Sequence, residues 1–84
     1  SSLRVRCAML EAIAATHSEE YYPSLLRGLQ YKSTRDAALH ALVRLDNDAI
    51  PLLVRLAEDP YQPELVRTYA LTAMGQIGSV EALN

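Results

Sequence analysis

The sequence predicts an all-α fold of stacked antiparallel helix pairs. A helical apolar pattern recurs three times along the 84 residues, and a proline-led segment recurs between its copies. Half of the residues are apolar, whereas three glycines and four prolines supply little turn material for an all-β fold. A chain of this length makes at most one domain.

The first recurring segment is anchored on an arginine. Its copies are residues 5–13, 34–42 and 66–74, and their arginines lie 29 and then 32 residues apart. The fourth residue after the arginine is always Leu and the sixth is always Ala. Apolar residues three, four and seven positions after the arginine form one stripe of an α-helix. The spacing lies within the range of helical repeat proteins.

The second recurring segment begins one residue before a proline. Residues 22–27 align with residues 50–55, and both copies end in arginine. Proline is tolerated in the first turn of a helix, where its missing N–H has no partner in any case. Residues with capping side chains precede the predicted helices, and Gly78 predicts a helix end before a new start at Ser79. The predicted caps are Ser18, Ser33, and Asn47 or Asp48.

These patterns predict about six helices: 2–16, 19–30, 33–45, 48–58, 63–77 and 79–84. The connections are short, as antiparallel pairs require. The chain divides into a half-repeat (1–17), two repeats (18–46 and 47–78) and the start of another repeat (79–84).

One stretch carries a family resemblance. Residues 56–60 (Leu-Ala-Glu-Asp-Pro), residues 64–67 (Glu-Leu-Val-Arg) and residues 70–78, which close on Gly-Gln-Ile-Gly, resemble the HEAT-like repeat named after phycobilisome lyases. The resemblance implies a superhelical α-solenoid, with this chain as a fragment of a larger one. It also allows a bilin lyase-type enzyme, which would need a tetrapyrrole pocket.

The chain departs from that family's pattern at three places. The turn between Asp59 and Arg67 is longer than usual, and Thr34 stands where valine is typical. Tyr69 occupies the position of Ala8 and Ala37 in the other copies. These departures affect local packing rather than the predicted fold.

Composition argues against several classes of function. The net charge of −2, with a pI near 5.5, opposes nucleic-acid binding, which requires a clustered basic excess. No apolar run approaches the ~18 residues of a membrane span. Cys7 is the only cysteine and cannot form an internal disulfide, so a reducing, cytoplasmic location is expected.

The chain shows no pattern of catalytic or metal-binding residues. Cys7, His17 and His40 are the only soft ligands, and they lie ten and 23 residues apart on different predicted helices. The sequence has no phosphate-binding glycine loop and no nucleophile motif. We therefore expect no enzyme activity, no cofactor and no metal.

The repeated arginines Arg6, Arg35 and Arg67 have two interpretations. They could form a ladder that binds anions, or each could brace a turn. The five donors of a guanidinium suit bonds to turn carbonyls or to an acid such as Asp36 or Asp59. Bracing is the favoured interpretation.

The candidate binding surface is the polar face of the helices that carry Arg6, Arg35 and Arg67, which are expected to line the concave surface of a solenoid. Positions one, five and nine after each arginine give the rows Cys7/Asp36/Thr68, Glu11/His40/Thr72 and Ala15/Arg44/Gln76. Such a mixed face suits another protein or a peptide better than phosphates. The predicted partner-binding residues are Asp36, His40, Arg44, Tyr69, Thr72, Gln76 and Tyr61.

Several alternatives stay open at this point. The polar face could be merely solvated, and the chain could be a structural spacer in a longer solenoid. For Tyr61 and Tyr69, contact with a partner and simple packing are equally compatible with the sequence, whereas Tyr22 is expected to cover a helix edge. Apolar residues near both ends predict some end-to-end self-association: Val5, Met9, Ile13, Val80 and Leu83.

Overall fold

The computed structural model describes the backbone of residues 2–83 and the side chains of residues 2–80. The described chain is helical, without a strand, which confirms the predicted all-α class. The helices are α1 (Leu3–Thr16), η1 (Glu19–Tyr21), α2 (Tyr22–Gly28), α3 (Arg35–Leu45), η2 (Asp46–Ala49), α4 (Ile50–Glu58) and α5 (Glu64–Leu83), where η denotes a short 3₁₀ segment.

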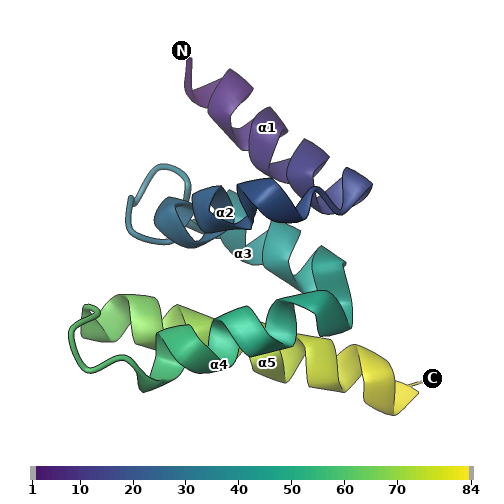
Figure 1. Cartoon of the computed structure of the whole chain (residues 1–84), viewed down its shortest axis with the longest axis vertical. Helices are drawn as coiled ribbons and strands as arrows, with labels where there is room; N and C mark the ends of the chain where they lie inside the picture. Colours follow the sequence, from purple (N-terminus) through teal and green to yellow (C-terminus); the bar gives the residue numbers. More distant parts are fainter. Residues whose placement is uncertain (1, 84) are drawn as a thin grey trace.

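The three arginine-bearing helices lie beside one another in chain order (Figure 1). Helix α3 occupies the middle and packs against both α1 and α5. Helices α2 and α4 lie on one side of this row, α2 against α3 and α1, and α4 against α5. The molecule measures 36 × 31 × 20 Å, so it is two helices thick. Helices α1, α3 and α5 form one layer, the row, and helices α2 and α4 form the second layer, which covers it.

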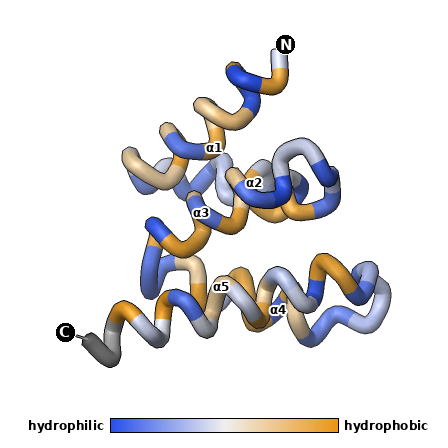
Figure 2. The backbone as a smooth tube through the Cα atoms, turned by 180° about the vertical axis from the view of Figure 1, so that it is seen from behind, coloured by the Kyte–Doolittle hydropathy of each residue, from blue (hydrophilic) through white to orange (hydrophobic). Residues whose placement is uncertain are grey.

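The core lies between the row and its cover. Hydrophobic residues recur along the five α-helices (Figure 2), and each of these helices contributes buried residues to one core cluster. Ala38 and Ala41 on α3 and Ala70 and Ala73 on α5 are fully buried and let neighbouring helices approach closely. The largest fully buried side chains are Leu25, Leu29, Leu42, Leu45, Leu53 and Val66.

The first helix has a capped start and a left-handed end. The Val5 amide donates to Ser2 Oγ at 3.2 Å, which satisfies one of the unpaired N–H groups of the first turn. At the other end His17 adopts φ 50°, and the Ser18 amide donates back to the Ile13 carbonyl at 3.2 Å. This geometry ends α1 and reverses the chain toward α2.

The predicted caps of the later helices are wrong in detail. Ser18 makes no capping hydrogen bond, and its Oγ lies 2.6 Å from Thr16 Oγ1 instead. Thr34, rather than Ser33, directly precedes α3. Where Asn47 or Asp48 was expected to cap a helix, the 3₁₀ segment η2 leads into α4 without a side-chain cap.

The predicted break at Gly78 is also wrong. Helix α5 runs without interruption from Glu64 to Leu83, so the predicted helices 63–77 and 79–84 are one helix as far as the structure describes them, with Asn84 outside the described residues. Ser79 Oγ donates to the Gly75 carbonyl one turn earlier, at 3.0 Å. A glycine in a helix interior costs only about 0.5–1 kcal/mol, which the rest of a long helix outweighs. The described chain therefore has five α-helices rather than six.

Helices α2 and α3 pack closely at Gly28, which has no side chain. A Cβ atom added to Gly28 would lie 3.0 Å from the Ala38 Cβ and 3.3 Å from Leu10 Cδ1. Thr34 Oγ1 donates to the Gly28 carbonyl at 2.7 Å inside this contact. Thr34 thus has a structural reason to differ from the valine of the resembled pattern, because its hydroxyl satisfies a buried carbonyl.

Replacing Gly28 with alanine is expected to destabilise the fold by about 1–3 kcal/mol, because the added methyl group overpacks the α1–α2–α3 junction. Gly75→Ala serves as the matched control, since a Cβ at Gly75 meets nothing within 4 Å. That control should stabilise the protein by about 0.5–1 kcal/mol through helix propensity. Urea denaturation of both variants measures the difference. Equal effects of the two substitutions would contradict the tight junction.

Candidate functional site

The predicted polar face exists as a surface shared by α1 and α3. His40 Nδ1 lies 2.7 Å from Glu11 Oε1, and Arg44 Nη1 lies 3.6 Å from Glu11 Oε2. Glu11 on α1 therefore bridges to two side chains one turn apart on α3. Glu11 and His40 belong to the middle row of exposed positions in the sequence pattern, which did not predict a contact between them.

A second set of contacts joins α3 to α5. The Tyr69 hydroxyl donates to Asp36 Oδ1 at 3.4 Å. The guanidinium carbon of Arg35 lies 5.5 Å from the centre of the Tyr69 ring, within cation–π range. Tyr69, which replaces a small residue of the other copies, therefore reaches across to the neighbouring helix. We refer to the surface carrying Glu11, Asp36, His40, Arg44, Tyr69, Thr72 and Gln76 as the α1–α3–α5 face.

The remaining predicted residues lie in two places. Thr72 and Gln76 are exposed on α5 and continue the rows of the face along that helix. Tyr61 belongs to the α4–α5 turn and is 94% exposed. Its amide donates to Asp59 Oδ1 at 2.9 Å, so the aspartate closes the turn and holds the tyrosine outward.

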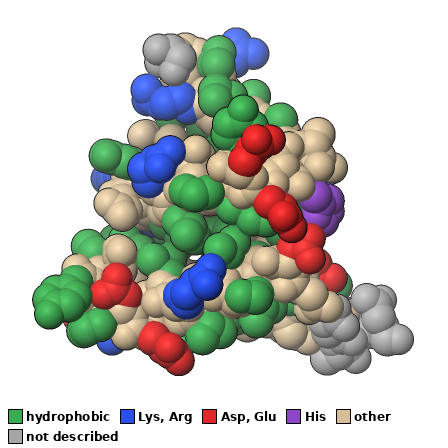
Figure 3. Space-filling view, viewed as in Figure 1, with side chains coloured by type: hydrophobic (Ala, Val, Ile, Leu, Met, Phe, Trp, Pro, Cys, Tyr) green, Lys and Arg blue, Asp and Glu red, His purple; other side chains and the backbone are tan. Residues whose placement is uncertain are grey.

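Basic and acidic side chains take different places on the surface. On the side covered by α2 and α4, basic side chains stand singly among apolar and neutral ones, whereas several acidic side chains follow one another along the side of the view that carries a histidine (Figure 3). On the α1–α3–α5 face, the acids Glu11 and Asp36 accompany Arg44 and His40. This mixture offers both hydrogen-bond donors and acceptors to a partner.

Two of the repeated arginines brace turns, as predicted. Arg35 Nε donates to the Leu29 carbonyl at 2.8 Å, and its Nη2 donates to the Gln30 carbonyl at 3.4 Å. Arg67 Nε donates to the Ala57 carbonyl at 3.3 Å. Each guanidinium thus meets carbonyls at the end of the preceding helix, which have no partner within that helix.

Each histidine contacts one carboxylate on another segment of the chain. His17 Nδ1 lies 2.9 Å from Asp48 Oδ2, which links the end of α1 to η2. His40 pairs with Glu11, as described above. Within the described residues, no three His, Cys, Asp or Glu side chains are grouped to hold a metal ion. Cys7 is half-buried on α1 with a free thiol.

Tyr22 is part of the core, which corrects its predicted place at a helix edge. The side chain is 6% exposed and its hydroxyl has no hydrogen-bond partner in the described part of the chain. Burial raises the pKa of the Tyr22 hydroxyl above its ordinary 10.0, and the carboxylates of Asp48 and Glu19 raise it further. The sequence did not reveal this burial, because nothing in it distinguishes Tyr22 from its exposed neighbour Tyr21.

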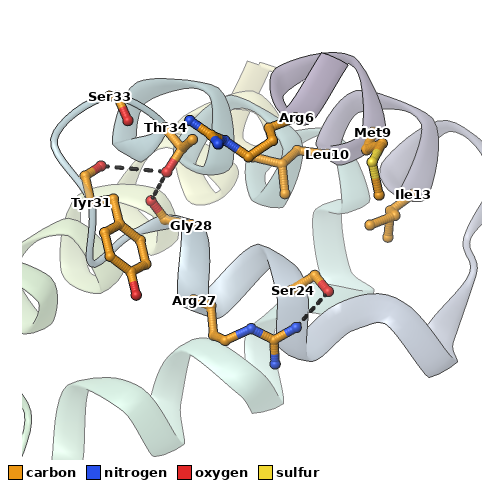
Figure 4. Close-up of a pocket in the computed structure, with 10 residues that line it drawn as sticks. All are labelled: Arg6, Met9, Leu10, Ile13, Ser24, Arg27, Gly28, Tyr31, Ser33 and Thr34. Carbon is orange, nitrogen blue, oxygen red and sulfur yellow. Dashed lines mark hydrogen bonds between the residues drawn. The ribbon is translucent and has the colours of Figure 1, made fainter. Parts of the chain in front are cut away.

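A groove that the sequence did not reveal lies between α1 and α2 (Figure 4). It encloses about 450 Å³ and is closed at one end by the α2–α3 turn. We refer to it as the α1–α2 groove. Its lining residues are Arg6, Met9, Leu10, Ile13, Ser24, Arg27, Gly28, Tyr31, Ser33 and Thr34.

Comparison with known proteins does not assign a function to the chain, so its function has to be inferred from its geometry. No protein-family model, curated protein or solved structure matches the chain. Among the described helices, none combines the length and the apolar character needed to cross a lipid bilayer.

Arg35→Met is expected to lower the free energy of unfolding by about 1–3 kcal/mol, because methionine retains part of the stem but leaves the Leu29 carbonyl, whose bond to Arg35 is part-buried, without its charged donor. Arg44→Met is the matched control. Arg44 is exposed and pairs with Glu11 at 3.6 Å, so its loss should cost no more than about 1 kcal/mol. Chemical denaturation of the two variants measures both values, and equal losses would refute the bracing role.

Tyr22→Phe is expected to change how stability depends on pH. Above pH 10.0 tyrosine ionises in the unfolded chain, while the raised pKa keeps Tyr22 protonated in the folded chain. Rising pH therefore favours the unfolded wild type, and this loss should be smaller in the phenylalanine variant. Denaturation at pH 8 and pH 10.5 tests this. At pH 8 the variant should be at least as stable as the wild type, because it removes an unpaired buried hydroxyl.

Proposed function

We propose that this chain is a HEAT-like solenoid segment that binds another protein or a peptide through the α1–α3–α5 face. The repeated use of one device supports the repeat assignment. Helices α2 and α3 form one antiparallel pair and α4 and α5 form the next, and an arginine early in each second helix holds the end of the first. Stacked pairs of this kind are the building unit of α-solenoids.

The observation that carries the binding proposal is the set of contacts between helices across the face. Glu11 is tied to His40 and Arg44, and Asp36 is tied to Tyr69. Ordering a flexible side chain at an interface costs about 0.5–1.5 kcal/mol each. Side chains that are already held in one arrangement avoid part of this cost, so the face is partly organised before a partner arrives.

The chemistry of the face favours a protein or peptide as the partner. It combines carboxylates, a guanidinium, an imidazole, a tyrosine and neutral polar groups within one row of helices. A partner would need complementary charges of both signs. Tyrosine and arginine are common anchors at protein interfaces, which makes Tyr69 and Arg44 the expected centre of the contact.

A pull-down from native lysate, read by mass spectrometry, tests the proposal. A wild-type bait is compared with a variant bait that carries Asp36→Ala, His40→Ala and Arg44→Ala. A protein captured by the wild-type bait should be absent from the variant bait or captured at least about tenfold less, because hot-spot truncations commonly cost more than 1 kcal/mol each. Circular dichroism must first establish that both baits are equally helical.

The control bait carries Arg55→Ala and Glu58→Ala on α4. Both residues are exposed and lie outside the face. Replacing this pair leaves the net charge unchanged, and so does the triple substitution. This bait should retain the captured protein. Capture of the same proteins by all three baits would refute the α1–α3–α5 face as the binding surface. No specific capture by any bait would favour a structural spacer.

A further inference from the structure

The α1–α2 groove is large enough for a small molecule, and one of its walls is apolar. Its volume of about 450 Å³ lies within the range of small-molecule sites. Met9 and Ile13 stand on the α1 wall, and Leu10 lines the groove beside them (Figure 4). Leu10 and Ile13 are buried, whereas Met9 is 56% exposed, so Met9 presents the open surface of this wall. The apolar part of a ligand would therefore lie along α1.

The opposite wall, on α2, is polar and basic. Arg27 Nη2 donates to Ser24 Oγ at 2.9 Å, which holds the exposed guanidinium at this wall with one of its five N–H donors. Arg6 also lines the groove and already interacts with another group of the chain, so it adds positive charge rather than an open donor. No carboxylate belongs to the lining as far as the structure describes it. The groove therefore favours an anion.

The kinds of side chain around the groove favour a flat ring in that anion. A thioether packs well against an aromatic ring, and a guanidinium stacks on its face. Met9 and Arg27 supply these two groups from opposite walls, and Tyr31 adds a ring of its own at the α2–α3 turn. An aromatic ligand would contact all three groups, whereas an alkyl chain would gain apolar contact alone.

We propose that the α1–α2 groove binds a small aromatic carboxylate of one or two fused rings, with the ring against Met9 and the carboxylate at Arg27. A carboxylate and a guanidinium can pair through two parallel hydrogen bonds, which orients the ligand as well as attracting it. None of the groove residues belongs to the α1–α3–α5 face, so this site is separate from the proposed function.

The experiment titrates the whole chain with naphthoate. The chain has two methionines, Met9 in the groove and Met74 half-buried on α5, so methyl-labelled methionine provides a probe and an internal control. The Met9 methyl resonance should shift to saturation while that of Met74 stays in place. A dissociation constant of about 1 mM is expected, which is typical of a ligand of this size.

Two further ligands separate the charge from the ring. Naphthalenemethanol keeps the rings without the charge and should bind about tenfold more weakly, because it loses the charge-assisted hydrogen bonds. Octanoate keeps the charge without a ring and should bind about threefold more weakly, because it loses the contacts between the ring and the guanidinium. Equal affinity for naphthalenemethanol would refute the anionic group, and equal affinity for octanoate would refute the ring.

Arg27→Gln tests the residue assigned to the carboxylate. It should weaken naphthoate binding about tenfold and change the affinity for naphthalenemethanol less than about twofold, because only the charged ligand uses the guanidinium. Arg55→Gln is the matched control, since Arg55 holds the same position in the other proline-led segment, is exposed and lies outside the groove lining. It should change neither affinity by more than about twofold. Equal weakening of both ligands by Arg27→Gln would contradict the assignment.

Two outcomes of the titration itself would overturn the proposal. The first is no shift of Met9 at a naphthoate concentration about tenfold above the expected dissociation constant. The second is an equal shift of Met9 and Met74. The Asp36, His40 and Arg44 triple variant should bind naphthoate like the wild type, so a failure of the pull-down and a failure of this test can be told apart.

Discussion

Side chains from the start of α3 hold the last carbonyl groups of α2, and the packing of the molecule depends on this joint. Thr34 and Arg35 donate to the carbonyls of Gly28, Leu29 and Gln30. Helix ends leave carbonyls without partners, and burying them unpaired is costly. Since the donors come from the next helix, satisfying them also fixes α2 against α3. Gly28 can then touch Ala38, and α3 is placed so that its other sides meet α1 and α5.

The second helix pair satisfies the same requirement with different residues. Arg67 reaches the Ala57 carbonyl, but Val66 takes the place of Thr34 and Leu56 that of Gly28. The longer turn is closed locally, because Asp59 accepts from the Tyr61 amide and its carbonyl accepts from the Gln62 amide. The arginine is therefore the shared part of the joint. The turn around it can lengthen, which explains why the arginines are spaced by 29 and then 32 residues.

The sequence predicted what depends on local periodicity and failed where distant contacts decide. The helices around Arg35 and Arg67 were predictable because their apolar stripes are local, and the register of the repeats placed Glu11 and His40 in one row without predicting their contact. The continuity of α5 through Gly78 was not predictable, because glycine favours helix ends but costs only about 0.5–1 kcal/mol in a helix interior, which is too little to end this long helix. The second contact of Glu11, with Arg44, and the groove both depend on the offset between helices, which a single sequence does not encode locally.

Helix α1 contributes residues both to the polar face and to the wall of the α1–α2 groove. Glu11 faces α3 and contacts His40 and Arg44, while Met9 lines the groove. Helix α3 packs against α1, α2 and α5, whereas α1 packs mainly against α3 and makes fewer contacts with α2. Because Glu11 supplies the α1 side of the contacts with His40 and Arg44, the arrangement of the polar face depends on how α1 packs against α3.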